Sequence, residues 1–531
     1  MATSTGQKTA TVKQAAKMGV FTLIIMNIVA VVSLRGLPAE AEYGVSSAFY
    51  YIFAAIVFLI PVSLVAAELA AMFPYQQGGM FRWVGEAYGD KVGFLGIWLQ
   101  WIESTIWFPT VLTFGAVSLA FIGMDHVYDA HLAANKWYTI AVVLAIYWIA
   151  TFISLKGMGW VGKVSKIGGI VGTIIPVVIL VVCAIVYLAT GGKSQMDWHG
   201  SFIPDFSNFN NIILAVSIFL FYAGMEMSGI HVREIKNPTV NYPKAVIIGA
   251  LATVAIFILG TYSLGVIIPA KDINLVQSLL VGFDNYFGAL HMKWFAPIIA
   301  IALAFGVLAG VLTWVAGPSK GVFAVGQAGY LPKFFQKTNK NGVQKNILYV
   351  QGIAVTVLSF IMVLMPSVQS FYQILSQLTC ILYLIAYLLM FASSIKLRYS
   401  MKNAPRPYRL GKKGNGMMWL IAGVGFLGSA IAFIFSFFPP AQIQMGSNAV
   451  WFTVLILGTI VFVVLPFIIL HFKKPSWDAM GTSFVPFHWD NSAQAVQERL
   501  QAAEEFASEN ADNPDAAKFV EYAKSDQQAQ K

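Results

Sequence analysis

Twelve apolar runs of about 20 residues recur along this 531-residue chain. This is the length at which a helix crosses the roughly 30 Å hydrocarbon core of a bilayer. Lipid cannot hydrogen-bond to a protein backbone, so such runs are restricted to helices that satisfy their own polar groups. We therefore predict an all-α membrane protein that spans the lipid bilayer. The predicted spans lie near residues 18–38, 46–72, 92–121, 137–155, 165–189, 210–230, 244–268, 294–318, 346–365, 370–395, 417–438 and 449–471.

Basic residues are distributed unevenly between the predicted loops. Most Lys and Arg residues outside the spans lie on the side that holds the N-terminus, whereas the opposite loops carry only Lys136, Lys193, Lys271 and Lys293. By the positive-inside rule, this asymmetry predicts that both termini are cytoplasmic, in agreement with an even number of spans. The basic excess thus indicates topology in the cell membrane, and we expect no nucleic-acid partner.

The order of the spans predicts an internal inverted repeat. Spans one to five and six to ten form two halves, and an odd number of helices per half places the halves in opposite orientations, as in many secondary transporters. The predicted divisions are a cytoplasmic segment over 1–17, a transporter domain over 18–471 with repeats near 18–189 and 210–395 and extra helices over 417–471, and a cytoplasmic tail over 472–531.

The sixth span is interrupted around an acidic residue. Glu226 lies two residues after Gly224 and three residues before Gly229. A carboxylate at this depth rarely faces lipid, and unwound backbone is tolerated only where it lines a cavity or is packed in protein. We interpret Glu226 and the backbone at Gly224 as part of a substrate-binding site. The alternative is a protonated, structural glutamate in a loosely packed helix.

The first span contains a matching interruption, because Arg35, Gly36 and Pro38 break its apolar run. Paired breaks in corresponding segments of two halves point to a binding site near the membrane midplane. Arg35 would bind a substrate carboxylate through its planar fork. Alternatively, its side chain would extend to the outer surface beside Glu40 and Glu42.

Three other charged residues are candidates for gating or coupling. Glu103, in the third span, would pair with Arg35, line the transport path or make a hydrogen bond between helices. Glu68 lies near the cytoplasmic end of the second span, and we expect it either to act in a gate or to hold a loop, together with nearby Arg82. Lys163 is expected near the cytoplasmic gate, although basic loop residues are more often only topology signals.

Several short motifs follow one another over residues 17–472: AAELA at 66–70, QGGMFRWV at 77–84, GMEMS at 224–228, GVLA at 306–309, GPSKG at 317–321, NKNGV at 339–343 and FSFFPP at 435–440. In this order they resemble the glutamate/γ-aminobutyrate antiporter family of the amino acid–polyamine–organocation superfamily. The resemblance implies a LeuT-like fold, with two inverted five-helix repeats and two peripheral helices. It also implies exchange of an external amino acid for its internal decarboxylation product, in acid resistance alongside a cytoplasmic decarboxylase.

The resemblance assigns four residues to the substrate site. Glu226 matches the acidic position of the broken sixth helix, Trp314 the tryptophan of the eighth helix, and Tyr383 and Tyr387 two tyrosines of the tenth. Aromatic rings of this kind cover the aliphatic part of a substrate and favour an ammonium group over their faces. The alternative role of the three aromatic residues is core packing or a place in the aromatic belt at the membrane interface.

Two positions depart from the family pattern. Arg35 stands where the best-known members have a tyrosine, and Gly310 stands where they have a glutamate. These departures leave the substrate pair open. Glutamate with γ-aminobutyrate is the default, and tyrosine with tyramine or histidine with histamine are alternatives. A proton-coupled amino acid symporter and a transporter-like amino acid sensor are the other functions considered.

We expect neither an enzyme nor a cofactor or metal site. All seven histidines lie in loops, at span ends or in the tail, so the sequence predicts no catalytic histidine or metal site within the membrane. It also lacks a glycine-rich phosphate loop with Lys-Ser or Lys-Thr, so ATP is not expected to drive transport. The family resemblance suggests that the tail over 472–531 plugs the cytoplasmic vestibule. The alternative is a peripheral tail bound to basic loops.

Overall fold

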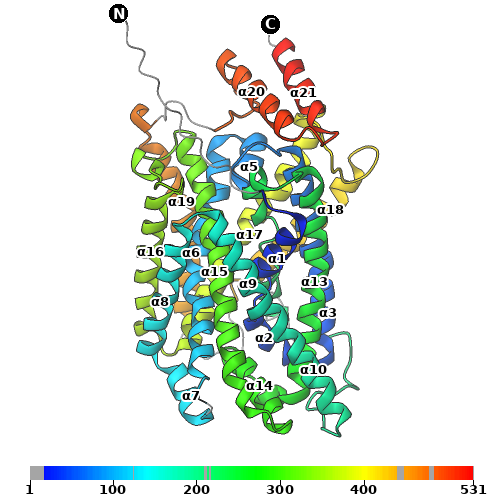
Figure 1. The fold of residues 1–531 in the computed structure, drawn as a ribbon, viewed down its shortest axis with the longest axis vertical. Coiled ribbons are helices and arrows are strands. Elements are labelled where there is room, and N and C mark those ends of the chain that lie inside the picture. The colour runs from blue at the N-terminus through cyan, green and yellow to red at the C-terminus, as the bar shows by residue number, and fades with distance from the viewer. Residues whose placement is uncertain are drawn as a thin grey trace, which may run out of the picture.

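The computed structural model describes residues 17–123, 125–207, 212–213, 217–438, 448–477 and 484–529. Within these ranges the chain is helical, and its only β-type pairing is an isolated bridge between Met18 and Ile235. The helices run largely along the longest axis of the molecule (Figure 1). The predicted all-α class is therefore confirmed.

The two ends of the bundle differ in the short helices that they carry (Figure 1). One end holds α5 (Met80–Tyr88) and the two tail helices, α20 (Ala493–Glu509) and α21 (Ala516–Ala529). We call it the terminal end. The opposite end holds α7 (His126–Ala134) and α14 (Ser278–Ala289).

Eleven segments of the described chain are long and apolar enough to cross a membrane, and they match eleven of the twelve predicted spans. The twelfth, predicted over 210–230, falls partly outside the described residues, and its described part is broken. The crossing elements are α1 (Val20–Val31) with η1 (Leu34–Gly36) and α2 (Leu37–Ala41), α3 (Ser47–Ala54) with η3 (Ala55–Leu59) and α4 (Ile60–Met72), α6 (Asp90–Ala120), α8 (Lys136–Ser154), α9 (Met158–Gly169) with η4 (Ile170–Ile174) and α10 (Ile175–Ala189), α12 (Ser217–Phe221) with η5 (Met227–Glu234), α13 (Pro238–Ile267), α15 (Ala296–Gln327), α16 (Lys345–Phe360), α17 (Val368–Ser400), α18 (Gly416–Phe435) and α19 (Asn448–His471).

Both predicted helix breaks are present. The first helix of the first half stops at Val31, and Val32 and Ser33 are extended before the short turn η1 begins. In the second half, turns over residues 222–226 separate α12 from η5. Gly224 has a φ of 115°, a conformation that side chains other than glycine rarely adopt. The two breaks thus free backbone groups at equivalent places in the two halves.

The burial of the spans separates the centre of the bundle from its lipid-facing rim. In the most apolar stretch of the α6 span 89% of the residues are buried, but in the α19 span only 11% are buried. A helix buried on all sides lies in the core of a bundle, whereas an apolar helix exposed on most sides faces lipid. Helix α6 is therefore central, next to α15 and α17, and α19 is peripheral.

The packing of the bundle can be tested where η4 crosses α15 at close distance. A Cβ atom added to Gly172 in η4 would lie 2.2 Å from the backbone nitrogen of Gly306 in α15. We expect Gly172→Ala to force these helices apart and to destabilise the protein by about 1–3 kcal/mol, measured as a lower melting temperature in detergent. Gly162→Ala is the matched control, because nothing lies within 4 Å of its added Cβ. Equal stability of the two variants would contradict the crossing.

Candidate transport site

Glu226 is the polar centre of the second helix break. Its side chain is only 1% exposed, and it accepts hydrogen bonds from the hydroxyl groups of Tyr383 and Tyr387 and from the amide of Gln100. The Tyr387 bond is 2.7 Å long and the Gln100 bond 2.8 Å. Because the tyrosines belong to α17 and Gln100 to α6, the carboxylate joins the broken helix to two core helices.

Tyr387 makes a second contact that fixes the unwound backbone. Its hydroxyl oxygen accepts a 2.7 Å hydrogen bond from the backbone N–H of Gly224 while it donates to Glu226. A buried N–H group left without an acceptor is costly, so this bond stabilises the turn. The rings of Tyr383 and Tyr387 stack with centroids 4.5 Å apart, as their spacing of four residues on one helix allows.

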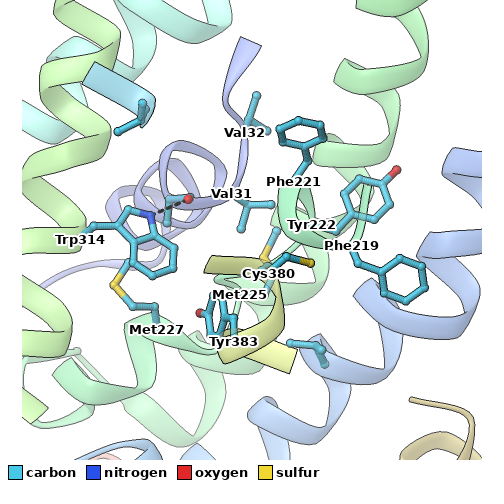
Figure 2. Packing of buried hydrophobic residues seen from close by; sticks show 14 of the residues in the cluster. Val31, Val32, Phe219, Phe221, Tyr222, Met225, Met227, Trp314, Cys380 and Tyr383 are labelled. Atoms are coloured by element: carbon cyan, nitrogen blue, oxygen red, sulfur yellow. Dashed lines mark hydrogen bonds between the residues drawn. The ribbon is translucent and has the colours of Figure 1, made fainter. Parts of the chain in front are cut away.

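Trp314 connects the two breaks (Figure 2). Its indole N–H donates a 2.8 Å hydrogen bond to the carbonyl of Ala30, just before the break in the first span. Its ring also covers Gly224, where an added Cβ would lie 2.7 Å from the ring. Tyr383 meets the same indole edge-on at 5.8 Å. The predicted residues Gly224, Glu226, Trp314, Tyr383 and Tyr387 are therefore brought together.

Arg35 lies in η1 and is buried, with 2% exposure. The alternative in which its side chain extends to the outer surface is therefore wrong. Its guanidinium lies 5.6 Å from the ring centroid of Trp107, 5.7 Å from that of Phe221 and 5.1 Å from that of Tyr372. Nε and Nη1 meet no hydrogen-bond acceptor in the described part of the chain.

A small cavity lies between the breaks. Arg35 and Glu103 both line it, together with Ser33, Trp314 and Tyr383, and Oε1 of Glu103 has no hydrogen-bond donor among the described residues. Its volume is about 20 Å³, which is room for about one water molecule. A substrate would therefore require the surrounding helices to separate.

Two more cavities adjoin this one. One of about 30 Å³ is lined by Ser33, Trp107 and Gly310, and a Cβ added to Gly310 would lie 3.5 Å from the carbonyl oxygen of Val29 in α1. The other, of about 20 Å³, lies beyond Arg35 and is lined by Tyr372, Ser376 and other residues. Ser33 at the first break lines the first two cavities, and Arg35 lines the first and the third.

Glu68 has different partners from those the sequence predicted. Its carboxylate accepts two 2.6 Å hydrogen bonds from Arg398, and Nε of Arg406 lies 3.4 Å away. The backbone N–H of Leu410 adds a 2.7 Å bond. Glu68 thus holds the loop after α17, as the expected loop-holding role requires, but the predicted pairing with Arg82 is wrong because Arg82 is engaged elsewhere.

Arg82 binds Glu86 one turn along α5, at 2.9 Å, and also binds the C-terminal tail. It donates to the carbonyls of Val485 and Pro486, and its guanidinium lies over the rings of Phe484 and Phe487. The aromatic part of the tail is therefore packed on the terminal end of the bundle.

Lys163 is exposed on α9. Its ammonium lies 5.9 Å from the ring centroid of Trp160, at the surface and not among the residues of the central cavity. A different lysine, Lys320 in α15, pairs with Glu234 at the end of η5, and Glu234 also binds His231 at 2.9 Å. The sequence reasoning did not single out this ion pair, because no pattern along the chain relates residues 234 and 320.

Gln100 was also missed, although the sequence carried a signal for it. It is a polar residue inside an apolar span, three positions before Glu103, so the two side chains share one face of α6. A face with two polar residues in a membrane helix is expected to point to the bundle interior.

Two broken helices that meet at a buried acid and an aromatic cluster, within a bundle of membrane-crossing helices, define a secondary transporter. The fold agrees with the crystal structure of MhsT in complex with L-phenylalanine, a LeuT-fold transporter. That likeness has a TM-score of 0.61 at 14% identity and covers 78% of this chain and 98% of MhsT. The predicted LeuT-like fold is confirmed.

The profile of the amino acid permease family matches residues 18–465. An uncharacterized transporter of Legionella pneumophila is 38% identical over 85% of this chain and 96% of its own length. A glutamate/γ-aminobutyrate antiporter of Lactococcus lactis is 32% identical over 86% of this chain and 91% of its own. A probable agmatine/putrescine antiporter of the same species is 24% identical, over 86% of this chain and 95% of its own length.

The chain therefore belongs to the amino acid permease family and, within its superfamily, to the glutamate/γ-aminobutyrate antiporter family. It is a multi-pass protein of the cell membrane that transports amino acids, and it is not an enzyme.

The two bonds of Tyr387 lead to a prediction about this site. Tyr387→Phe leaves the Gly224 N–H without its acceptor and Glu226 without one donor, so we expect destabilisation of about 1–3 kcal/mol and at least tenfold slower amino acid exchange. Melting temperature and initial exchange rates measure both effects. Tyr138→Phe is the control, since it loses a single 3.0 Å bond to Ala116 away from the breaks. Wild-type exchange by Tyr387→Phe would contradict the role given to this hydroxyl.

Proposed function

We propose that this protein is an amino acid antiporter that works by alternating access, with glutamate and γ-aminobutyrate as its exchanged pair. The observation that carries the proposal is the meeting of both helix breaks at one buried cluster around Glu226 and Trp314. The 32% identity to antiporters with this substrate pair supports the choice of substrates.

The proposed site binds the two ends of an amino acid differently. Backbone N–H groups freed at the breaks bind the α-carboxylate, assisted by the dipoles of the short helices. Backbone carbonyls and Glu103 bind the ammonium group, because Glu226 is already held by three protein donors. Trp314, Tyr383 and Tyr387 cover the aliphatic part, and Glu226 keeps the break in its binding geometry.

Contacts at the terminal end form the proposed cytoplasmic gate. Glu234 of the broken helix is paired with Lys320 of α15, and the backbone of Met18 is hydrogen-bonded to that of Glu234 and Lys236. These contacts tie the ends of both broken helices to each other and to the core. In alternating access they would break when the site opens inward, with both termini in the cytoplasm.

The tail is the proposed plug of this gate. His488 lies 3.1 Å from Glu86, Lys17 pairs with Glu509 at 2.9 Å, and Asn513 binds Thr239 at 2.9 Å, next to the end of the broken helix. Burial alone would raise the pKa of Glu86, but the contacts with His488 and Arg82 outweigh it and hold that pKa below its ordinary value. A group with a lowered pKa stabilises the docked tail at neutral pH and ceases to do so as the pH falls through that pKa.

This balance predicts that the tail undocks in acid. Hydrogen–deuterium exchange of the tail in proteoliposomes, corrected for the pH dependence of intrinsic exchange, should be slow at neutral pH and faster below the lowered pKa of Glu86 in the wild type, and fast at both in Glu86→Gln. Glu504→Gln, an exposed change on α20, serves as the control and should behave like the wild type. A tail equally protected in Glu86→Gln at neutral pH would rule out this mechanism.

An antiporter of this kind would support acid resistance together with a cytoplasmic decarboxylase. Decarboxylation consumes a proton and yields the amine that leaves in exchange for the next amino acid. The same exchange therefore supplies the substrate and removes the product.

The first experiment is exchange in proteoliposomes loaded with unlabelled γ-aminobutyrate. We expect labelled glutamate to enter only with internal γ-aminobutyrate or glutamate, and faster at acidic pH. Glu226→Gln, which keeps the shape but loses the carboxylate, should insert normally and shift this pH dependence. Exchange only of tyrosine with tyramine or of histidine with histamine would replace the substrate pair, and uptake into empty vesicles would indicate a symporter. Binding without any counterflow would indicate a sensor.

A further inference from the structure

Arg35 is a buried cation with unused hydrogen-bonding capacity. Three aromatic rings surround its guanidinium and contribute cation–π attraction, and the hydroxyl of Tyr372 is the hydrogen-bond partner that they provide. Nε and Nη1 are without acceptors in the described part of the chain. A buried charge with two nitrogen atoms left without acceptors is only partly satisfied, so this arrangement is suited to an anion that arrives from outside the protein.

The space next to Arg35 is equipped for the same kind of ligand. Arg35 lines the cavity between the breaks and also the second cavity beyond it, toward Leu275 in the connection between α13 and α14. Tyr372 and Ser376 of α17 line this second cavity, and the hydroxyl of Ser376 has no hydrogen-bond partner among the described residues. The guanidinium and this hydroxyl are donors that a carboxylate can accept.

One face of α17 connects this subsite with the centre of the site. Ser376, Cys380, Tyr383 and Tyr387 follow one another at spacings of four, three and four residues. Ser376 is thus about 10 Å along the helix axis from Tyr383, which binds Glu226, at 1.5 Å per residue. Arg35 lines the same small cavity as Trp314 and Tyr383 and also the second cavity, where Ser376 continues this face of α17 away from Glu226.

The two exchanged molecules differ in one group only. Decarboxylation removes the α-carboxylate as CO₂ and leaves a proton in its place, while the amine and the side chain remain. A site that binds both molecules in turn needs its strongest fixed charge to face a substrate group that is present in both. Backbone N–H groups at the breaks serve the α-carboxylate, which only the amino acid has.

We infer that Arg35 binds the carboxylate at the end of the substrate side chain, a group present in both exchanged molecules. This inference rests on the proposed antiport function and specifies its substrate class. The protein then accepts amino acids with a side-chain carboxylate and the ω-amino acids made from them. It rejects neutral and cationic pairs, which would leave the Arg35 charge without a partner in the closed site.

The test compares Arg35→Gln and Arg35→Lys with the wild type in proteoliposomes, using glutamate, γ-aminobutyrate and glutamine. Glutamine replaces the side-chain carboxylate with an amide and leaves the rest of the molecule unchanged. We expect the wild type to exchange glutamate and γ-aminobutyrate in preference to glutamine. In Arg35→Gln the KM for both carboxylates should rise about 10- to 100-fold, because a charge-assisted bond is lost, while glutamine exchange is retained.

The other variants separate this role from a structural one. Arg35→Lys keeps the charge but loses the planar fork, so its KM should lie between those of the wild type and Arg35→Gln. Arg409→Gln removes an exposed loop charge and should leave every KM unchanged. If Arg35→Gln does not fold, as judged by size-exclusion chromatography, Arg35→Lys and the preference of the wild type for glutamate over glutamine decide the matter.

Three results would overturn the inference. Arg35→Gln that is folded and keeps both carboxylate KM values within about twofold would remove Arg35 from substrate selection. A wild-type protein that exchanges glutamine as well as glutamate would also remove Arg35 from substrate selection. Exchange of only a neutral or cationic pair would have the same meaning, and in both cases the antiport function would stand. A wild type that exchanges no amino acid at all would instead defeat the proposed function on which the inference rests.

Discussion

The hydrogen bonds to Glu226 are the contacts on which the central structure depends. A carboxylate this deep in a membrane protein is tolerable only when donors surround it, and here α6 and α17 supply three. Those donors fix the second helix break against the core. Trp314 then fixes the first break to the second, through Ala30 on one side and Gly224 on the other. Removing the acid would leave the second break, α6 and α17 without this common partner.

The spans and the breaks were predictable because each depends on residues that are close together in the chain. Apolar length predicts a crossing helix, and a glycine-flanked acid predicts an interruption, whatever lies elsewhere. The partner of Glu68 was not predictable in this way. Arg82 was chosen because it is near in sequence, whereas the structure brings in Arg398 from 330 positions away. The burial of Arg35 was not predictable from neighbouring residues either, since its three aromatic neighbours come from different helices.

The terminal end is built differently from the centre. Beside the aromatic packing of the tail, it has ion pairs and bonds to backbone carbonyls, among them the Arg398 bonds to Glu68 and the Arg82 bonds to the tail. Such contacts are directional and can be broken one at a time, unlike a packed aromatic core. The molecule thus combines a tightly packed centre with an end whose contacts suit repeated opening.

The hydroxyl of Tyr387 has a consequence for energy coupling. It receives the N–H of Gly224 and gives its own proton to Glu226, so it belongs to both the backbone and the acid. Protonation of Glu226 would weaken the hydrogen bond that this hydroxyl donates to the carboxylate. Rotation of the peptide at Gly224 would break the hydrogen bond that the hydroxyl accepts. The protonation equilibrium of Glu226 and the conformational equilibrium of the backbone at Gly224 are then coupled, and each shifts the other by the same free energy. A single phenol is enough to make that linkage.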